Sequence, residues 1–202
     1  MLTLHHAPRS RSGRTMWLLE ELGADYRTHY IGIRYGDGSG ARDPANPHPD
    51  GKAPALTHDD ALITEGMAIA LYLTDLVPSA GLGPTVGEPQ RGAYLAWLAW
   101  NTGELEPAVF GQMYGFAKDN PHAQAALDAA TARIEAALAA GPYMMGERFT
   151  AVDAMVGATL AWGRSVLPES RALDAYLARI AARPAHQAAQ AKDAQVKAAV
   201  AA

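Results

Sequence analysis

"GKAPALTHDDALITEG", residues 51–66, decides the fold, because it places a proline at the start of what otherwise looks like a β-strand. Proline has no N–H to donate to a neighbouring strand, so it is confined to sheet edges, turns and bulges. Beyond Pro54, two short apolar runs are joined by turn residues at 58–60, which predicts a hairpin. Residues 64–76 then predict a helix that carries Ile69, Leu73 and Leu76 on one face.

The chain before this stretch predicts a strand, a helix and a second strand. Residues 2–6 and 25–33 have the composition and alternation of strands, and residues 12–23 have apolar side chains at helical spacing before Gly23. The order predicts a parallel crossover to which the hairpin adds an antiparallel edge. Between them, residues 34–51 form a long connection, which predicts a short irregular helix or a functional loop.

The rest of the chain differs in composition and in the spacing of its apolar residues. Residues 77–89 are rich in Gly and Pro and predict a linker. Residues 90–202 are rich in alanine, and their periodicity predicts helices throughout, including a last one after Pro184. The predicted fold class is therefore α/β plus all-α, with a first domain at 1–76 and an all-helical domain at 90–202.

Composition and charge exclude several kinds of site and several classes of partner. Cysteine is absent from the 202 residues, which excludes disulfides, thiolate zinc sites and a cysteine nucleophile. The seven histidines show no spacing typical of metal ligands, so we expect no metal. Net charge is −4 with scattered Lys and Arg, which gives no support to nucleic-acid binding. No apolar run is long enough for a leader or a membrane span, which predicts a cytoplasmic protein.

Four stretches in this order and spacing resemble the cytosolic glutathione transferases, particularly their bacterial and fungal serine-type members. They are GKAPAL at 51–56, TEGMAIALYL at 64–73, PRSRSGRTMWLLEELG at 8–23 and TAVD at 150–153 after Phe149. The resemblance covers essentially the whole chain. It implies a thioredoxin-like domain with a mixed four-stranded sheet, a helical bundle, a homodimer, and conjugation of the glutathione thiolate to small hydrophobic electrophiles.

The resemblance also implies where glutathione binds. It makes Pro54 a cis-proline that leaves the backbone of Ala53 free to pair with the tripeptide as one more strand. Glu65 and Gly66, at the start of a helix, would hold the γ-glutamyl end, and Lys52 would meet a ligand carboxylate. The alternatives are a trans-proline at a sheet edge and an acid that only favours the helix dipole. Gly66 departs from the family, which has serine there and gains a hydrogen bond from its hydroxyl.

A donor aimed at the sulfur would stabilise the thiolate. The family uses Tyr, Ser or Cys at the end of the first strand, and here Ser10 and Ser12 are the candidates. Ser10 lies where the serine-type members carry their active residue, while both serines would alternatively serve only as helix caps. Arg11 between them would lower the thiol pKa as a nearby cation, or else be solvated.

The electrophile pocket implied by the resemblance lies between the domains. Phe110, Tyr114 and Phe116 are its candidate residues, with ordinary helix packing as the alternative. Three tryptophans, at positions 97, 100 and 162, are assigned to the core. Thr150 and Asp153 predict a capping box with a purely structural role.

Two other functions remain open at this stage. One is a glutathione-dependent peroxidase or isomerase that uses the same site. The other is a glutathione- or partner-binding scaffold without efficient turnover, which the glycine at position 66 favours.

Overall fold

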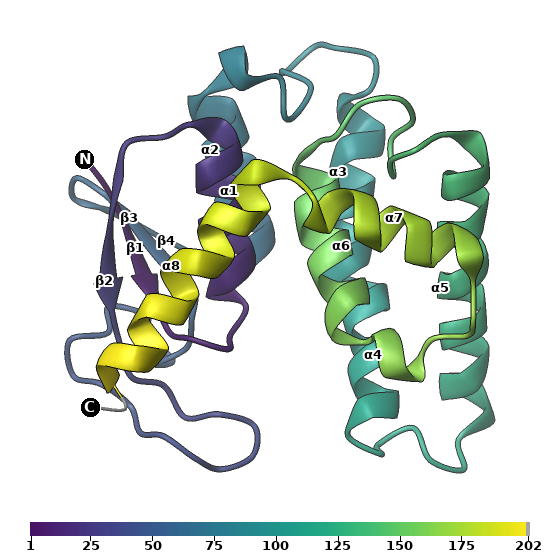
Figure 1. The fold of residues 1–202 in the computed structure, drawn as a ribbon, viewed down its shortest axis with the longest axis horizontal. Helices are drawn as coiled ribbons and strands as arrows, with labels where there is room; N and C mark the ends of the chain where they lie inside the picture. The colour runs from purple at the N-terminus through teal and green to yellow at the C-terminus, as the bar shows by residue number, and fades with distance from the viewer. Residues whose placement is uncertain (201–202) are drawn as a thin grey trace. The chain divides into compact units, whose positions relative to one another are not determined.

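The computed structural model describes the backbone of residues 1–200 and the side chains of residues 1–195 (Figure 1). The chain forms two compact units. Met1–Ala80 and the C-terminal segment from Pro184 make the first, called the N-terminal unit below. Gly81–Arg183 make the second, called the helical unit. The predicted fold class, a mixed sheet with helices followed by an all-helical part, is confirmed.

Four strands form the sheet of the N-terminal unit: β1 (Leu2–His6), β2 (Tyr26–Tyr30), β3 (Ala55–His58) and β4 (Ala61–Thr64). Their order is β2-β1-β3-β4, in which β1 is parallel to β2 and antiparallel to β3. β3 and β4 pair as the predicted antiparallel hairpin. Because β3 begins directly after Pro54, the proline precedes the ladder and removes none of its hydrogen bonds.

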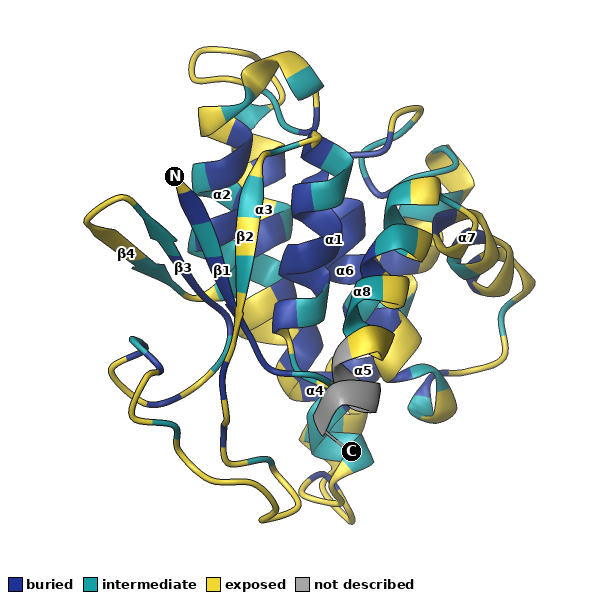
Figure 2. Cartoon of the chain, turned by 60° about the vertical axis from the view of Figure 1, so that its left-hand side comes forward, coloured by how far each residue is buried: buried dark blue, intermediate teal, exposed yellow. Residues whose placement is uncertain are grey.

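Three helices complete this unit: α1 (Ser12–Leu22), α2 (Gly66–Leu76) and α8 (Pro184–Val200). α1 is buried along most of its length and ends at Gly23, whose φ of 60° is the left-handed conformation that glycine adopts without strain (Figure 2). α8, the last element of the chain, packs along α1. The helix predicted for this stretch is confirmed as α2, although Leu76, its last residue, is 41% exposed while Ile69 and Leu73 are buried.

The helical unit is built around α6 (Ala151–Trp162), in which nine of twelve residues are buried. Its other elements are α3 (Arg91–Trp100), a π-helical turn η2 (Asn101–Leu105), α4 (Glu106–Met113), α5 (Pro121–Ala140), a 3-10 turn η3 (Arg164–Val166) and α7 (Arg171–Ala181). The helices predicted throughout 90–202 are thus interrupted: a π turn separates α3 from α4, and α4 ends at Met113. A further 3-10 turn, η1 (Pro78–Ala80), ends the first part of the N-terminal unit.

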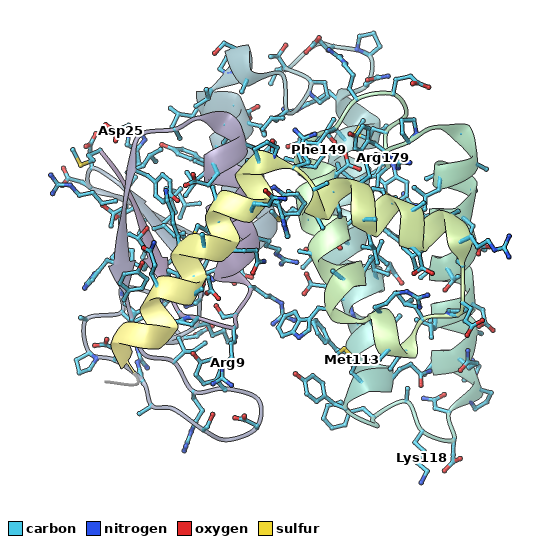
Figure 3. All side chains as sticks on the ribbon, viewed as in Figure 1. Arg9, Asp25, Met113, Lys118, Phe149 and Arg179 are labelled. Carbon is cyan, nitrogen blue, oxygen red and sulfur yellow. The ribbon has the colours of Figure 1, made fainter. Side chains whose placement is uncertain are left out.

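The predicted capping box opens α6. Thr150 is its N-cap, and the Asp153 carboxylate accepts the Thr150 backbone N–H at 2.8 Å and the Thr150 hydroxyl at 3.2 Å. The same carboxylate accepts the Met144 N–H at 2.8 Å and the Tyr176 hydroxyl at 3.1 Å. Figure 3 shows Phe149 and Arg179 near this end of the unit, around the turn that leads into α6. The box therefore anchors both the helix and the turn before it.

The loop predicted at 34–51 has no helix and no strand. It is held by turns in which the Asn46 amide donates to the Lys52 carbonyl at 3.0 Å, and His48 is buried. Within residues 1–200, no helix combines the length and apolarity required to cross a membrane.

Candidate functional site

The loop between β1 and α1 brings the two candidate serines together. Their hydroxyl oxygens are 2.7 Å apart, and the Ser10 hydroxyl donates to the Ala7 carbonyl at 2.7 Å. Ser10 is half-buried, whereas Ser12 is fully buried. Of the two serines, Ser10 is therefore the one that solvent can reach. Arg9, labelled in Figure 3, lies in the same loop with its guanidinium over the Tyr35 ring.

The serines do not act as a conventional N-cap. The N-cap of α1 is Arg11, which has no capping bond from its side chain, and Ser12 is the first helical residue. Instead, the Ser12 hydroxyl accepts the Ala7 N–H at 3.1 Å, and the Ser10 hydroxyl accepts the Ser12 N–H at 3.2 Å. These bonds fix the turn between strand and helix. Arg11 is exposed beside them.

Two further side chains extend this group on the buried side. His6, the last residue of β1, has Nδ1 at 2.8 Å from the Ser12 hydroxyl and Nε2 at 2.9 Å from the Asp193 carboxylate. His6 is fully buried, and the Asp193 side chain, on α8, is 14% exposed. This connection could not be predicted from the sequence, because 187 positions separate the two residues and no local pattern relates them.

The start of β3 has the geometry implied by the resemblance. The Ala53–Pro54 peptide bond is cis, as predicted. Ala53 lies outside the ladders of the sheet, because pairing begins at Ala55. Its side chain packs against the small cluster of Ala7, Ile31 and Ile33.

Glu65 has an unusual backbone. Its φ of 66° and ψ of 120° lie in a region that side-chain-bearing residues rarely occupy, and the residue is exposed as the N-cap of α2. Such conformations cost on the order of 1–3 kcal/mol and gather at functional sites. Lys52 is also exposed, with its ammonium 3.3 Å from the Asp50 carboxylate.

Gly66 has a specific neighbour that sequence reasoning missed. A Cβ atom at this position would lie 3.0 Å from Nη2 and 3.5 Å from Nε of Arg14. Arg14 comes from α1 and is only 8% exposed. Its guanidinium therefore fills the place that a side chain at position 66 would need. The periodicity of α1 shows where Arg14 stands on that helix, but it contains no information about α2.

The candidate electrophile residues lie together in the helical unit. The rings of Phe110 and Tyr114 are stacked with centroids 6.0 Å apart, and Tyr114 lies 6.2 Å from Phe116. Trp162 completes the cluster, 5.2 Å from Phe110. Tyr114 and Phe116 are 53% and 82% exposed, so helix packing does not account for them. Trp162 is 43% exposed, so its assignment to the core was wrong: it is the last residue of α6, where the buried surface ends.

Among the side chains that the structure describes, no group of three or more His, Asp or Glu residues is placed to hold a metal ion. The expectation of a metal-free site stays a prediction.

Comparison with known proteins links both units to one family. Residues 1–75 match the model described as "Glutathione S-transferase, N-terminal domain", and residues 90–185 match its C-terminal domain. Glutathione S-transferase GstA of Escherichia coli O157:H7 is 33% identical over 146 residues, which are 68% of this chain and 71% of that protein.

Solved structures show the same similarity. A glutathione transferase from Methylococcus capsulatus is 31% identical, with a TM-score of 0.77 over 96% of this chain and all of that one. A sphingomonad glutathione S-transferase complexed with glutathione is 30% identical, with a TM-score of 0.77 over 95% of this chain and 98% of that one.

Proposed function

Because this chain belongs to the glutathione S-transferase family, we propose that it joins the thiolate of glutathione to small hydrophobic electrophiles. The observation that carries the proposal is the Ser10 hydroxyl. It is the half-buried, solvent-reachable member of a hydrogen-bonded pair at the end of β1, in the same unit as the cis-proline and the strained Glu65.

The N-terminal unit offers complementary groups to each part of the tripeptide. The backbone of Ala53 lies outside the sheet and would pair with the cysteinyl backbone as an added strand. The exposed Glu65 carboxylate would accept the α-ammonium group, and the backbone N–H groups that open α2 would face the γ-glutamyl carboxylate. Lys52, on the exposed loop before β3, would meet the other carboxylate.

Arg14 accounts for the missing serine. Glycine at position 66 leaves room for the Arg14 guanidinium at the N-terminus of α2. We assign to Arg14 the contact with the γ-glutamyl carboxylate that a serine hydroxyl makes elsewhere in the family. A guanidinium binds a carboxylate through parallel charge-assisted hydrogen bonds, so this exchange sustains affinity. It also weakens the case for a scaffold without turnover, which depended on Gly66.

Ser10 would act on the sulfur. A free cysteine thiol has a pKa near 8.5, so only a small fraction is thiolate at neutral pH. A hydroxyl that donates to the sulfur stabilises the anion and lowers that pKa, and the exposed Arg11 would add positive potential beside it.

The aromatic cluster of Phe110, Tyr114, Phe116 and Trp162, in which all but the half-buried Phe110 are exposed, supports an apolar second substrate. Exposed aromatic groups of this kind mark surfaces that bind apolar partners. A homodimer and a cytoplasmic location remain predictions.

The test is the Ser10→Ala variant, assayed for conjugation with a general aromatic electrophile. We expect kcat/KM to fall about 10²–10³-fold, as when one donor to a developing anion is removed, with glutathione affinity retained. Ser79→Ala, on the exposed turn η1, is the matched control and should keep full activity. Unchanged conjugation by Ser10→Ala would remove Ser10 from the reaction. If the unaltered protein reduces peroxides or isomerises a substrate but does not conjugate electrophiles, the alternative function of a glutathione-dependent peroxidase or isomerase would be favoured.

A further inference from the structure

A continuous line of hydrogen bonds leads from Ser10 into the interior of the N-terminal unit. It runs from Ser10 to Ser12 at 2.7 Å, from Ser12 to His6 at 2.8 Å, and from His6 to Asp193 at 2.9 Å. We propose that His6, held by Asp193 of α8, is the base that receives the thiol proton of glutathione through Ser12 and Ser10. This inference rests on the proposed function, because it requires glutathione at Ser10.

The direction of the hydrogen bonds follows from their chemistry. An ionised carboxylate only accepts, so His6 Nε2 carries the hydrogen that it donates to Asp193. In the neutral imidazole the other nitrogen, Nδ1, is then an acceptor, and the Ser12 hydroxyl donates to it. The Ser12 oxygen then accepts from the Ala7 N–H, and it accepts from the Ser10 hydroxyl when the single hydrogen of Ser10 turns to it from the Ala7 carbonyl, which also lies 2.7 Å from the Ser10 oxygen. With the Ser10 hydrogen turned in this way, both serine hydroxyls donate toward His6.

This order permits a balanced transfer of a proton. The S–H bond of glutathione breaks as its proton moves to the Ser10 oxygen, while the Ser10 proton moves to Ser12 and the Ser12 proton moves to His6 Nδ1. Thiol and neutral imidazole become thiolate and imidazolium, with no proton gained or lost overall. Afterwards each hydroxyl donates in the opposite direction, so Ser10 donates to the thiolate, as the proposed function requires.

The surroundings of His6 suit a group that becomes charged. Burial alone opposes an imidazolium, and a carboxylate in hydrogen-bond contact offsets that cost. From β2 the polar neighbour is Tyr30, whose ring meets the imidazole edge-on at 5.8 Å, and α1 contributes Ser12. On α8, the residue before Asp193 is Lys192, which pairs with Glu20 of α1. Asp193 is thus the anionic partner of His6, and both are positioning residues that act through the serines.

α8 would therefore have a role in the reaction, although it lies far from the serines in the sequence. It joins the N-terminal unit from the far end of the sequence and packs along α1, the helix that begins at Ser12 (Figures 1 and 2). Through Asp193 it fixes the imidazole tautomer on which the whole line of donors depends.

The first experiment counts protons on the unaltered protein. Ultraviolet difference absorption measures the thiolate formed when glutathione binds at neutral pH. Calorimetry in buffers of different ionisation enthalpy measures the protons released, with S-methylglutathione as the reference that lacks the thiol proton. We expect thiolate formation with far less than one proton released per thiolate, because His6 retains it. Release of about one proton per thiolate, or binding without thiolate, would overturn the proposal.

Variants identify the base. In Asp193→Asn and in His6→Gln, we expect the ratio of bound thiolate to thiol to fall about tenfold or more, equivalent to a rise of at least one unit in the thiol pKa. Affinity for S-methylglutathione should be unchanged. Lys192→Met is the matched control, because it removes a neighbouring tie between α8 and α1 without touching His6. A ratio in Asp193→Asn and His6→Gln equal to that of the control would show that the line has only a structural role.

The two proposals fail differently. If Ser10→Ala abolishes thiolate formation while the His6 and Asp193 variants do not, Ser10 stands as the donor and the inference about the base is wrong. If the unaltered protein does not bind glutathione at all, the proposed function is wrong and the inference falls with it.

Discussion

Gly66→Ser introduces the side chain that the family carries at this position, and the structure predicts that it will not tighten glutathione binding. The new Cβ would lie 3.0 Å from Arg14 Nη2, closer than such contacts normally are, so the guanidinium has to move by a few tenths of an ångström. Arg14 is buried, which leaves it little freedom to adjust.

The expected magnitude comes from two opposing contributions. A hydrogen bond to a charged group contributes about 1.5–3 kcal/mol. Displacing Arg14 would remove up to that amount from the binding free energy of glutathione. The serine hydroxyl would return a similar amount. The net change in binding free energy should therefore lie near zero or be unfavourable. Gly66→Ala adds the same Cβ without a hydroxyl, so we expect it to weaken binding by about 1.5 kcal/mol, or roughly tenfold in Kd.

Isothermal titration calorimetry with glutathione on these variants measures the effect. Thermal unfolding of each variant should accompany it, because overpacking costs about 1–3 kcal/mol of stability by itself. A tenfold or greater gain in affinity for Gly66→Ser would refute the reasoning, since it would mean that the hydroxyl is simply missing and that Arg14 does not replace it. The double variant Arg14→Met/Gly66→Ser, compared with the two single variants, completes a double-mutant cycle. The serine should improve binding only where the guanidinium has been removed.

Two further predictions concern stability. Burial lowers the pKa of His5, and repulsion from the ring of His29, 5.3 Å away, lowers it further. Just below about pH 6.5 the folded state therefore binds fewer protons than the unfolded state. Because acid then favours the unfolded state, Tm should fall on acidification. In His29→Asn the pKa of His5 moves back toward its ordinary value and Tm should fall less. An identical fall in both proteins, measured by thermal unfolding from about pH 7 to pH 5, would contradict this. Thr150→Ala should lower the unfolding free energy of the protein by about 1 kcal/mol by removing the N-cap of α6, whereas Thr150→Ser, which keeps the hydroxyl, should lie within a few tenths of the original. Denaturant titration distinguishes the two.

Local patterns predicted most of the fold because they depend on neighbours in the sequence. The hairpin at β3 and β4 and the capping box at Thr150 follow from residues within a dozen positions of one another. Leu76 and Trp162 show the limit of periodicity. It identifies the side of a helix on which a residue lies, but not how far the surface that covers that side extends.

The candidate site could be predicted only in part for the same reason. The sequence indicated the serines, the proline and the start of α2, since each belongs to a continuous motif. The contacts that give those residues their chemical setting join separate segments. Arg14 meets Gly66 through the packing of α1 against α2, and Asp193 meets His6 across nearly the whole chain. Such pairs are determined by tertiary packing, which no single stretch encodes.

The grouping of α8 with the first unit also has a consequence for synthesis. Read along the chain, the helical unit is an insertion within the N-terminal unit, which is completed only by the segment from Pro184 onward. A ribosome therefore delivers every residue of the helical unit before the last element of the N-terminal one. Domains that emerge complete fold as units during translation. The N-terminal unit, whose synthesis begins first, is therefore expected to finish folding after the helical unit, and the imidazole of His6 acquires its carboxylate partner only when α8 packs against α1.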